Sequence, residues 1–353
     1  GASIMTIKPV FASFAKLVYV SSWMKCHHPA VFACALLNSQ PMGFYAPAQI
    51  VRDARENGVT VRAIDVGHSD WDCTLEDGLA LRLGLRQVDG LQQDAMERVM
   101  AARPFRDVDD LRTRAHLDRR QMKILAEADA LGSLGQTRRD GMWSVMGHLD
   151  GAAAPVFDVA AATPQGPDRA VDLPKMPKAE EVVADYQTTR LSLKGHPMSF
   201  FRNSLQTQGY ACASELWGMG HGRRVKLAGL VLVRQKPGSA KGVCFITLED
   251  ETGVANLVIW PDKFEAMRGV IMSSRLMSVT GQVQTDGKVL HVVVQHIENR
   301  TDALDHLADV ELPAITVRGD HPTHPISNQV RSMPGQRTHP RDVRVIPKSR
   351  DFH

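Results

Sequence analysis

The pattern of apolar and polar positions is most regular between residues 223 and 299. Apolar residues there alternate with polar ones in runs of strand length, and turn-forming residues separate the runs. Between the third and fourth runs, a proline followed by polar and apolar residues at helical spacing indicates a short helix. The predicted strands and helix are, in chain order, Arg223–Arg234, Val243–Asp250, Val254–Trp260, the helix Pro261–Arg268, Ser274–Thr285 and Lys288–Ile297.

The turns of this stretch support the same interpretation. Glu251-Thr252-Gly253 joins the second and third strands, and Asp286-Gly287 joins the last two as a strong hairpin signal. Gly229 lies inside the first strand, where a glycine usually marks a bulge or a barrel corner. Five strands with a helix after the third are typical of an OB-fold barrel. The second and third strands of such barrels and their loops commonly hold single-stranded nucleic acid.

The chain before this barrel is mainly helical. Apolar residues at helical spacing predict helices over Phe14–Cys26, Pro29–Leu37 and Pro47–Asn57. Val59–Asp65 is expected to be extended. Alternation from Trp71 to Leu83 about a turn at Asp77-Gly78 predicts a hairpin.

Residues 84–135 change to short helices and turns. Val88-Asp89-Gly90-Leu91 precedes a predicted helix at Gln93–Ala102, and a second pair is predicted at Asp107–Ala115 and Asp118–Leu131. A helix-hairpin-helix binds DNA because its hairpin and the following helix N-terminus point free N–H groups at a phosphate. Two ordinary helical hairpins are the alternative. Charged residues that would contribute to DNA binding here are Arg98, Arg103, Arg119, Arg120 and Lys123.

Composition limits what this chain can be. Its 353 residues allow about two or three domains. A net charge of +3 excludes a uniformly basic surface, although residues 223–300 carry 11 Lys/Arg against 7 Asp/Glu and residues 318–353 carry 7 against 3. The five cysteines contain no CxxC pair, which fits reduced thiols better than disulfides or a zinc site. With no apolar run long enough for a bilayer and no signal peptide, the chain is expected to be cytoplasmic.

Long motifs resemble the C-terminal part of bacterial C-family DNA polymerases, and most closely the error-prone, SOS-associated paralogue of the polymerase III alpha subunit. The similarity covers about residues 11–300 and the last fifteen residues, but not the first ten. It rests on SSWMKCHHPAVFACALLNSQPMGFYAPAQIVRDAR (21–55), HSDWDCTLE (68–76), LRLGLRQVDGL (81–91), LSLKGHPMSF (191–200), KGVCFITLEDETGVANLVIWPDKFE (241–265) and HPRDVRVIPKSRDFH (339–353).

The resemblance implies an α+β multidomain chain. It comprises the end of a fingers domain (1–65), a hairpin and tandem helix-hairpin-helix region (66–150), a linker (151–178), a helical connection (179–222), an OB-fold domain (223–300) and a basic, Pro/His-rich tail (301–353). The family's N-terminal PHP domain and its palm, which carries the catalytic aspartates and Mg²⁺, would precede the fingers. We therefore expect no catalytic residue, metal or cofactor in this chain and no polymerase activity from it alone. Without the palm, the fingers remnant would expose apolar faces, and we expect aggregation or disorder before about Val59.

Several candidate residues follow from this assignment. In the fingers remnant, Lys25, His27 and His28 could neutralise nucleotide triphosphate charge, or could form an ordinary junction between helices. Adjacent ligands rarely converge on one ion, so a metal site is disfavoured there. Asp70-Trp71-Asp72 has the form of a metal-binding pair, but its place after a turn favours a structural role.

In the helix-hairpin-helix region Gly90 is the central residue, and Gln92 stands where the family often has a second glycine. In the barrel, Arg234, Lys236 and Lys241 flank the first loop. If Leu257 and Ile259 point inward, Asn256, Val258 and Trp260 face outward. Trp260 would then stack on a base, or alternatively pack under the helix at Phe264.

The expected partners are single-stranded template and primer–template duplex DNA, in damage-induced translesion synthesis, replication or repair. The alternative function is a noncatalytic nucleic-acid-binding or assembly module acting in trans with other damage-response proteins. The tail Arg341–His353 is a candidate for docking on such a protein or for nonspecific DNA binding, with disorder as the alternative. Pro155-Val156-Phe157 lies where relatives carry a clamp-binding peptide, but it lacks the glutamine-led pattern. An RNA-binding synthetase appendage would not explain residues 21–55.

Overall fold

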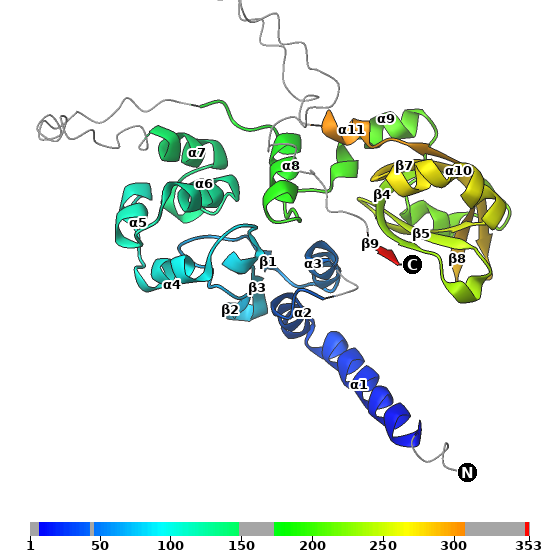
Figure 1. Cartoon of the computed structure of the whole chain (residues 1–353), viewed down its shortest axis with the longest axis horizontal. Helices are drawn as coiled ribbons and strands as arrows, with labels where there is room; N and C mark the ends of the chain where they lie inside the picture. Colours follow the sequence, from blue (N-terminus) through cyan, green and yellow to red (C-terminus); the bar gives the residue numbers. More distant parts are fainter. Residues whose placement is uncertain (1–6, 43–45, 148–172, 308–349, 353) are drawn as a thin grey trace, which may run out of the picture. The chain divides into compact units, whose positions relative to one another are not determined.

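The computed structural model describes residues 7–42, 46–147, 173–307 and 350–352. Its contacts divide the chain into two compact units. The first consists of Gly1–Met176 and Thr188–Leu193, and the second of Pro177–Gln187 and Lys194–His353. The first unit is mostly helical and the second contains a β-barrel, so the predicted α+β class is confirmed (Figure 1). The Pro155-Val156-Phe157 segment and most of the tail lie outside the described residues.

The first unit begins with three helices, α1 (Ile7–His27), α2 (Pro29–Asn38) and α3 (Pro47–Glu56). Helices α2 and α3 contribute to the core of the unit through the small and branched side chains Ala30, Ala33, Leu37, Ile50, Val51 and Ala54. The expectation of disorder before Val59 is therefore wrong for these two helices, because their apolar faces are covered within the unit itself.

Helix α1 differs from its neighbours because it projects from the unit, with α2 beside its C-terminal end (Figure 1). Large apolar side chains along it are exposed to solvent: Phe14, Leu17, Val18, Tyr19 and Trp23. A helix that is apolar and exposed is marginally stable by itself, because most helical stability in proteins comes from packing.

A small sheet follows, made of β1 (Val61–Arg62), β2 (Thr74–Glu76) and β3 (Ala80–Arg82) in the order β1-β3-β2. The antiparallel β2–β3 pair is the predicted hairpin, and Gly78 adopts the positive φ of 73° that its turn requires. Before β2, the carboxylate of Asp70 lies 3.2 Å from Arg103 and that of Asp72 lies 2.6 Å from Arg86. These ion pairs support the structural interpretation of the Asp70-Trp71-Asp72 motif.

Four helices complete the first unit: α4 (Gln93–Ala101), α5 (Val108–Arg114), α6 (Arg119–Glu127) and α7 (Arg138–Gly147). Fully buried side chains hold them together, among them Met96, Val99, Leu111, Leu125 and Leu131. Helix α6 ends before the predicted Leu131, because Asp129 has a left-handed φ of 57°. Helix α7 was not predicted, since its sequence RRDGMWSVMG has few apolar residues and two glycines.

The second unit is built around a closed barrel of β4 (Arg224–Gln235), β5 (Cys244–Asp250), β6 (Gly253–Ile259), β7 (Leu276–Thr285) and β8 (Leu290–Asn299). The strands neighbour one another in the order β5-β6-β8-β7-β4, and a β5–β4 pairing closes the ring. Helix α10 (Pro261–Ser273) lies between the third and fourth strands, so the predicted OB order is confirmed. The interior is filled by apolar side chains that include Ile246, Leu257, Ile259, Met277, Val283 and Val292.

Shorter elements surround this barrel. They are α8 (Lys178–Thr188), α9 (Arg202–Thr207), α11 (Asp302–Asp305) and the terminal strand β9 (Arg350–Phe352), which pairs in parallel with β4. All five cysteines are free thiols, and burial raises the pKa of Cys73 to about 11. Within the described ranges, no helix is both long and apolar enough to cross a bilayer.

Two strand glycines allow the barrel to close. A Cβ added to Gly229 would lie 2.7 Å from the carbonyl oxygen of Glu249, and one added to Gly281 would lie 2.5 Å from that of Val293. Both obstacles are backbone atoms of a paired strand, which cannot move aside as a flexible side chain would. The glycine expected to mark a barrel corner at position 229 therefore permits a close approach of two strands.

We predict that Gly229→Ala lowers the free energy of unfolding of the barrel by about 1–3 kcal/mol, because the added methyl group overpacks the β4–β5 contact. Hydrogen exchange of barrel amides would measure this change. Gly269→Ala is the matched control, since a Cβ added at that α10 position would meet no atom within 4 Å apart from adjacent residues and the backbone of its own helix. The control should be neutral or stabilising by up to about 1 kcal/mol. Equal effects of the two substitutions would contradict the prediction.

Candidate nucleic-acid interface

The first hairpin of the helical region turns at Gly90. This residue has a φ of 90°, and an added Cβ would lie 3.3 Å from Ile124 of α6. Both the backbone conformation and the tight contact favour glycine. Gln92, in contrast, has an extended backbone with φ −102° and ψ 135°, which any residue adopts. The glutamine at this position therefore causes no backbone strain in the hairpin.

The helix after this hairpin, α4, begins without a side-chain cap. Helices α5 and α6 differ, since Asp107 accepts a hydrogen bond from the Asp110 N–H and Asp118 accepts one from the Gln121 N–H. Of α4, α5 and α6, it is therefore α4 whose first-turn N–H groups have no side-chain cap. Such free N–H groups at a helix N-terminus favour the binding of an anion. Asp94 in the same turn opposes an anion, so added positive charge is needed nearby.

Part of the negative charge at the hairpin is already neutralised. The guanidinium of Arg190 lies 2.8 Å from the carboxylate of Asp89, and the Asp89 N–H donates to the carbonyl of Thr188. Residues 188–193 belong to the first unit, so these contacts lie within it. Residues 188–193 therefore hold the hairpin in place. Arg190 neutralises the carboxylate of Asp89, whereas Asp94 in the first turn of α4 keeps its negative charge.

The predicted cations Arg119 and Arg120 lie in the first turn of α6, and both are exposed. The next residue, Gln121, donates to Gln92 over 3.5 Å, which brings this turn beside the first hairpin. Gln121 also donates its backbone N–H to Asp118 and accepts from the Asp118 N–H, which completes a capping box. The cap fixes the turn that carries both arginines.

The other three predicted cations of this region, Arg98, Arg103 and Lys123, have partners within the structure. Arg103 donates from Nε to the carbonyl of Val66 over 2.8 Å and pairs with Asp70. Arg98 donates from Nε to the carbonyl of Ala115 over 3.0 Å and from Nη1 to that of Asp94 over 3.2 Å, which ties α4 to the loop before α6. Lys123 lies 3.6 Å from Glu127 in an exposed i,i+4 pair, a contact of little energy that leaves the lysine available.

The fingers candidates lie where α1 meets α2. Lys25 forms a 2.7 Å ion pair with Asp53 of α3, and the rings of His27 and His28 lie 5.0 and 5.2 Å from that of Trp23. These contacts connect α1 to α3 and to His28, the residue that precedes α2. They support the interpretation of this motif as a helix junction, while nucleotide binding at these residues remains a prediction.

The barrel presents a mixed polar and apolar face on β5 and β6. Leu257 and Ile259 are fully buried, so the predicted alternation is confirmed, and Asn256 and Trp260 are exposed on the other side. The cross-strand pairs on the outward face are Phe245 with Val258 and Thr247 with Asn256. Phe245 was not predicted from the sequence as a residue of this face. Its place there depends on the register of β5 against β6, which sets it opposite Val258.

Trp260 is 54% exposed at the end of β6, whereas Phe264 of α10 is buried. Packing of Trp260 under the helix is therefore not observed. The ring of Phe264 is covered by Lys236, whose ammonium lies 4.1 Å from the ring centroid and 3.3 Å from Glu265. This exposed ion pair contributes little energy, so Lys236 can exchange it for a phosphate at small cost. Lys241 is exposed on the same loop.

Arg234 was expected on this surface, and that expectation is wrong. Its side chain is buried, with 5% of the residue exposed, and it donates to the carbonyls of Ile271 and Ser274 at the end of α10. These are carbonyls that a helix end leaves without an intrahelical donor. Arg234 therefore fixes α10 against β4, a role that a sequence pattern of charges at a loop does not reveal.

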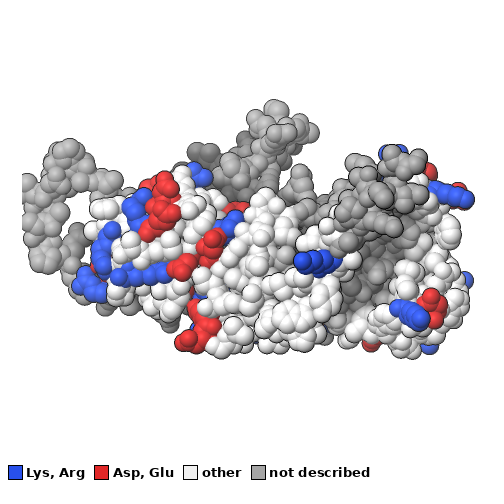
Figure 2. Space-filling view, turned by 90° about the horizontal axis from the view of Figure 1, so that it is seen from below, with Lys and Arg blue, Asp and Glu red and all other residues white. Residues whose placement is uncertain are grey.

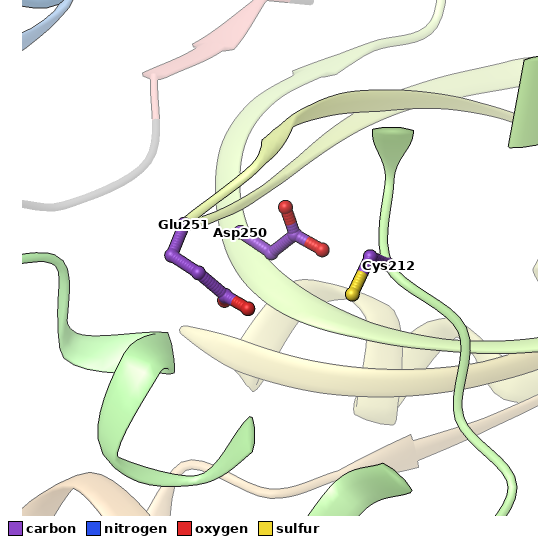
Figure 3. Close-up of side chains that lie close together, drawn as sticks. All are labelled: Cys212, Asp250 and Glu251. Atoms are coloured by element: carbon purple, nitrogen blue, oxygen red, sulfur yellow. The ribbon is translucent and has the colours of Figure 1, made fainter. Parts of the chain in front are cut away.

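Near the β5–β6 hairpin, ligand atoms of Cys212, Asp250 and Glu251 lie within 4.8 Å of one another (Figure 3). Arg202 already neutralises the two carboxylates, with Nη2 3.0 Å from Asp250 and 3.0 Å from Glu251. The hydrogen bonds that Arg202 donates to Glu251 raise the pKa of the Arg202 guanidinium, and burial raises the pKa of the Cys212 thiol. A protonated thiol and carboxylates bound to a guanidinium make this cluster a structural network rather than a metal site.

Asp250 also organises the hairpin itself. Its Oδ1 accepts from the N–H groups of Thr252 and Gly253, and its Oδ2 accepts from the N–H of Ala213. The network thus joins the turn between β5 and β6 to the segment that leads into the barrel.

Positive and negative side chains are mixed on the face of the structure that Figure 2 shows. On the face in Figure 2, Lys and Arg side chains are interspersed with Asp and Glu and separated by uncharged surface. The small net charge predicts that any contact with a polyanion would depend on local groups, for which the α6 turn and the loop after β4 are the candidates.

Comparisons with known proteins match both regions. A family model described as a helix-hairpin-helix motif matches residues 58–141, and one described as an OB-fold nucleic acid binding domain matches residues 225–300. The chain is 48% identical over 350 residues to the error-prone DNA polymerase of Brucella abortus biovar 1 (strain 9-941), covering 97% of this chain and 31% of the relative. It is 46% identical to the error-prone DNA polymerase of Rhodopseudomonas palustris (strain BisB5), covering 97% of this chain and 33% of the relative.

These matches confirm the resemblance indicated by the sequence motifs, and the chain spans about a third of the length of these relatives. Among solved structures, asparaginyl-tRNA synthetase from Pyrococcus horikoshii with asparaginyl-adenylate matches 26% of this chain and 22% of that chain, at 22% identity and a TM-score of 0.23.

We predict that Arg202→Met lowers the free energy of unfolding of the barrel by about 3 kcal/mol, because it leaves two shielded carboxylates without their cation. Hydrogen exchange of the β5 and β6 amides would measure the loss. Arg223→Met removes an exposed arginine next to β4 and should change stability by less than about 0.5 kcal/mol. If Zn²⁺ or Mg²⁺ stabilised the unmodified chain through this cluster, the structural interpretation would be wrong.

Proposed function

We propose that this chain, which is similar to about a third of an error-prone DNA polymerase, is the C-terminal portion of such an enzyme that holds DNA during damage-induced translesion synthesis. In this proposal the barrel binds the single-stranded template and the helix-hairpin-helix region binds the duplex product. The observation that carries the proposal is the outward face of β5 and β6, where the exposed Trp260 adjoins a loop with two exposed lysines.

The chemistry of this face suits a single strand. Base stacking on an aromatic side chain contributes about 1–3 kcal/mol per base and does not depend on sequence. Phe245 and Val258 extend the apolar surface on neighbouring strands, while Thr247 and Asn256 offer polar groups beside it. Lys236 and Lys241 would neutralise the phosphates that follow the stacked bases. A template strand with varied or damaged bases requires binding of this sequence-independent kind.

The helical region suits a phosphate backbone. The α4 N-terminus has no side-chain cap, Gly90 of the hairpin is exposed, and the α6 turn with Arg119 and Arg120 lies beside the hairpin. Backbone N–H groups and arginines contact phosphate without reading base identity. This arrangement supports a role in holding duplex, for which sequence independence is equally necessary.

We predict that Lys236→Glu/Lys241→Glu weakens binding of single-stranded DNA at least about tenfold. It should also reduce the slope of log K against log salt by about 1.4, because two phosphate contacts are lost. Fluorescence anisotropy with a labelled oligonucleotide at several salt concentrations would measure both quantities. Lys175→Glu/Lys178→Glu is the control, since it changes the net charge equally at exposed lysines outside the barrel strands and their loops.

An equal loss in both double variants would reduce the effect to overall charge and contradict a site on the barrel. Binding that is indifferent to the barrel variant would favour a protein-docking role for the barrel. The chain would then be better described as an assembly module acting in trans with other damage-response proteins.

We predict that Arg119→Glu/Arg120→Glu weakens binding of primer–template duplex about tenfold but leaves single-strand affinity within about twofold, because it removes phosphate contacts beside the first hairpin only. The same anisotropy titrations, run with duplex and with single-stranded DNA, would separate the two effects. The Lys175→Glu/Lys178→Glu variant again controls for net charge. A parallel loss for both DNA forms would contradict the division of labour between the two regions.

A further inference from the structure

Strand β4 extends beyond the partner that covers one of its two edges. Strand β7 pairs with β4 from Arg224 to Leu230, and the Val231 N–H donates to the carbonyl of Arg275 over 2.9 Å. Past this point, β5 continues on one edge as far as Gln235, but β7 has not yet begun on the other. The last residues of β4 thus present an edge that the barrel strands leave open.

Two features create this open edge. The β4–β5 register shifts between Val231 and Val233, a bulge that bends a strand away from its neighbour. Immediately afterwards, the side chain of Arg234 holds the end of α10 through the carbonyls of Ile271 and Ser274. The chain enters β7 only after this clamp, so β7 cannot extend along the end of β4.

An open edge carries unpaired N–H and C=O groups and accepts an additional extended segment. Here the terminal strand β9 occupies it. Val233, Arg234 and Gln235 pair in parallel with Arg350, Asp351 and Phe352, so the end of the chain returns to the barrel more than a hundred residues after β4 (Figure 1). The pairing ends at Gln235, directly before the loop that contains Lys236.

We propose that the edge of β4 at Val233–Gln235 is a strand-docking site and that its occupant is this chain's own terminal segment Arg350–Phe352. The terminal segment docks by backbone hydrogen bonds to the edge of β4 that β5 does not occupy. It thereby fixes the end of β4, where the 236–243 loop begins. The site is separate from the outward face of β5 and β6, and the proposal does not require that face to bind DNA. Its consequence is a mechanical link between the end of the chain and that loop.

Hydrogen exchange on the full chain and on a chain ending at Ser349 tests this proposal. Removal of the strand should reduce protection at least about tenfold at those amides among residues 233–236 that face β9, and it should leave the amides that face β5, and Ile246 and Leu257 inside the barrel, unchanged. Unchanged protection at residues 233–236 would overturn the proposal. A uniform loss that includes Ile246 and Leu257 would also overturn it, because the segment would then stabilise the barrel generally rather than occupy a local site.

A peptide of residues 341–353, added to the shortened chain, supplies a second and independent test. It should restore protection at residues 233–236. Peptides N-methylated singly at Arg350, Asp351 or Phe352 keep every side chain but each lose one backbone donor. A strand presents its donors to a given neighbour at every second residue. Two outcomes therefore fit strand pairing. Either the peptide methylated at Asp351 alone binds about tenfold more weakly, or the peptides methylated at Arg350, at Phe352 or at both positions do so while the Asp351 peptide binds normally.

Equal binding of all three methylated peptides would overturn strand pairing. The choice of occupant is tested by dilution of the full chain. Protection at residues 233–236 that stays constant over a hundredfold dilution supports docking within one chain. Protection that falls on dilution would assign the strand to a second copy and overturn the proposed occupant.

Discussion

The double pairing of β4 is the constraint on which the second unit depends. Its first half hydrogen-bonds to β7 and its second half to β5, and this change of partner closes the barrel. Closure removes sheet edges that would otherwise be exposed, and it requires two backbones to approach closely at Gly229. The outward face of β5 and β6 follows from this closure. Because successive side chains of a strand point to opposite faces, the residues that fill the barrel interior determine which of their neighbours point outward.

The groups proposed to bind DNA lie at the margins of the same arrangement. The loop that carries Lys236 and Lys241 begins where β4 ends, and Trp260 stands where β6 passes into α10. Arg234 holds α10 against β4, while the network of Arg202, Asp250 and Glu251 holds the β5–β6 hairpin. Buried charges therefore position the barrel's ends, and exposed charges remain available for a polyanion. The helical unit follows a similar division, with Arg98 used for packing and Arg119 and Arg120 exposed.

The sequence predicts the elements well because their signals are local. Alternation, hairpin turns at Gly253 and Gly287 and the helix cap at Asp118 each depend on a few neighbouring residues. The site is less predictable because it depends on distant partners. Arg234 resembles a surface cation until the end of α10, about forty residues later, supplies its carbonyl acceptors. Phe245 joins the outer face only through register with Val258, and the β9 pairing has no signal in periodicity at all.

A hydrogen-exchange footprint of a bound single-stranded oligonucleotide on the unmodified chain would test the central claim most directly, because it locates the strand without any substitution. The account predicts protection concentrated in the 236–243 loop and in the outward-facing region of β5 and β6 up to Trp260. Protection confined to the helical unit, with the barrel unchanged at saturating oligonucleotide, would contradict it.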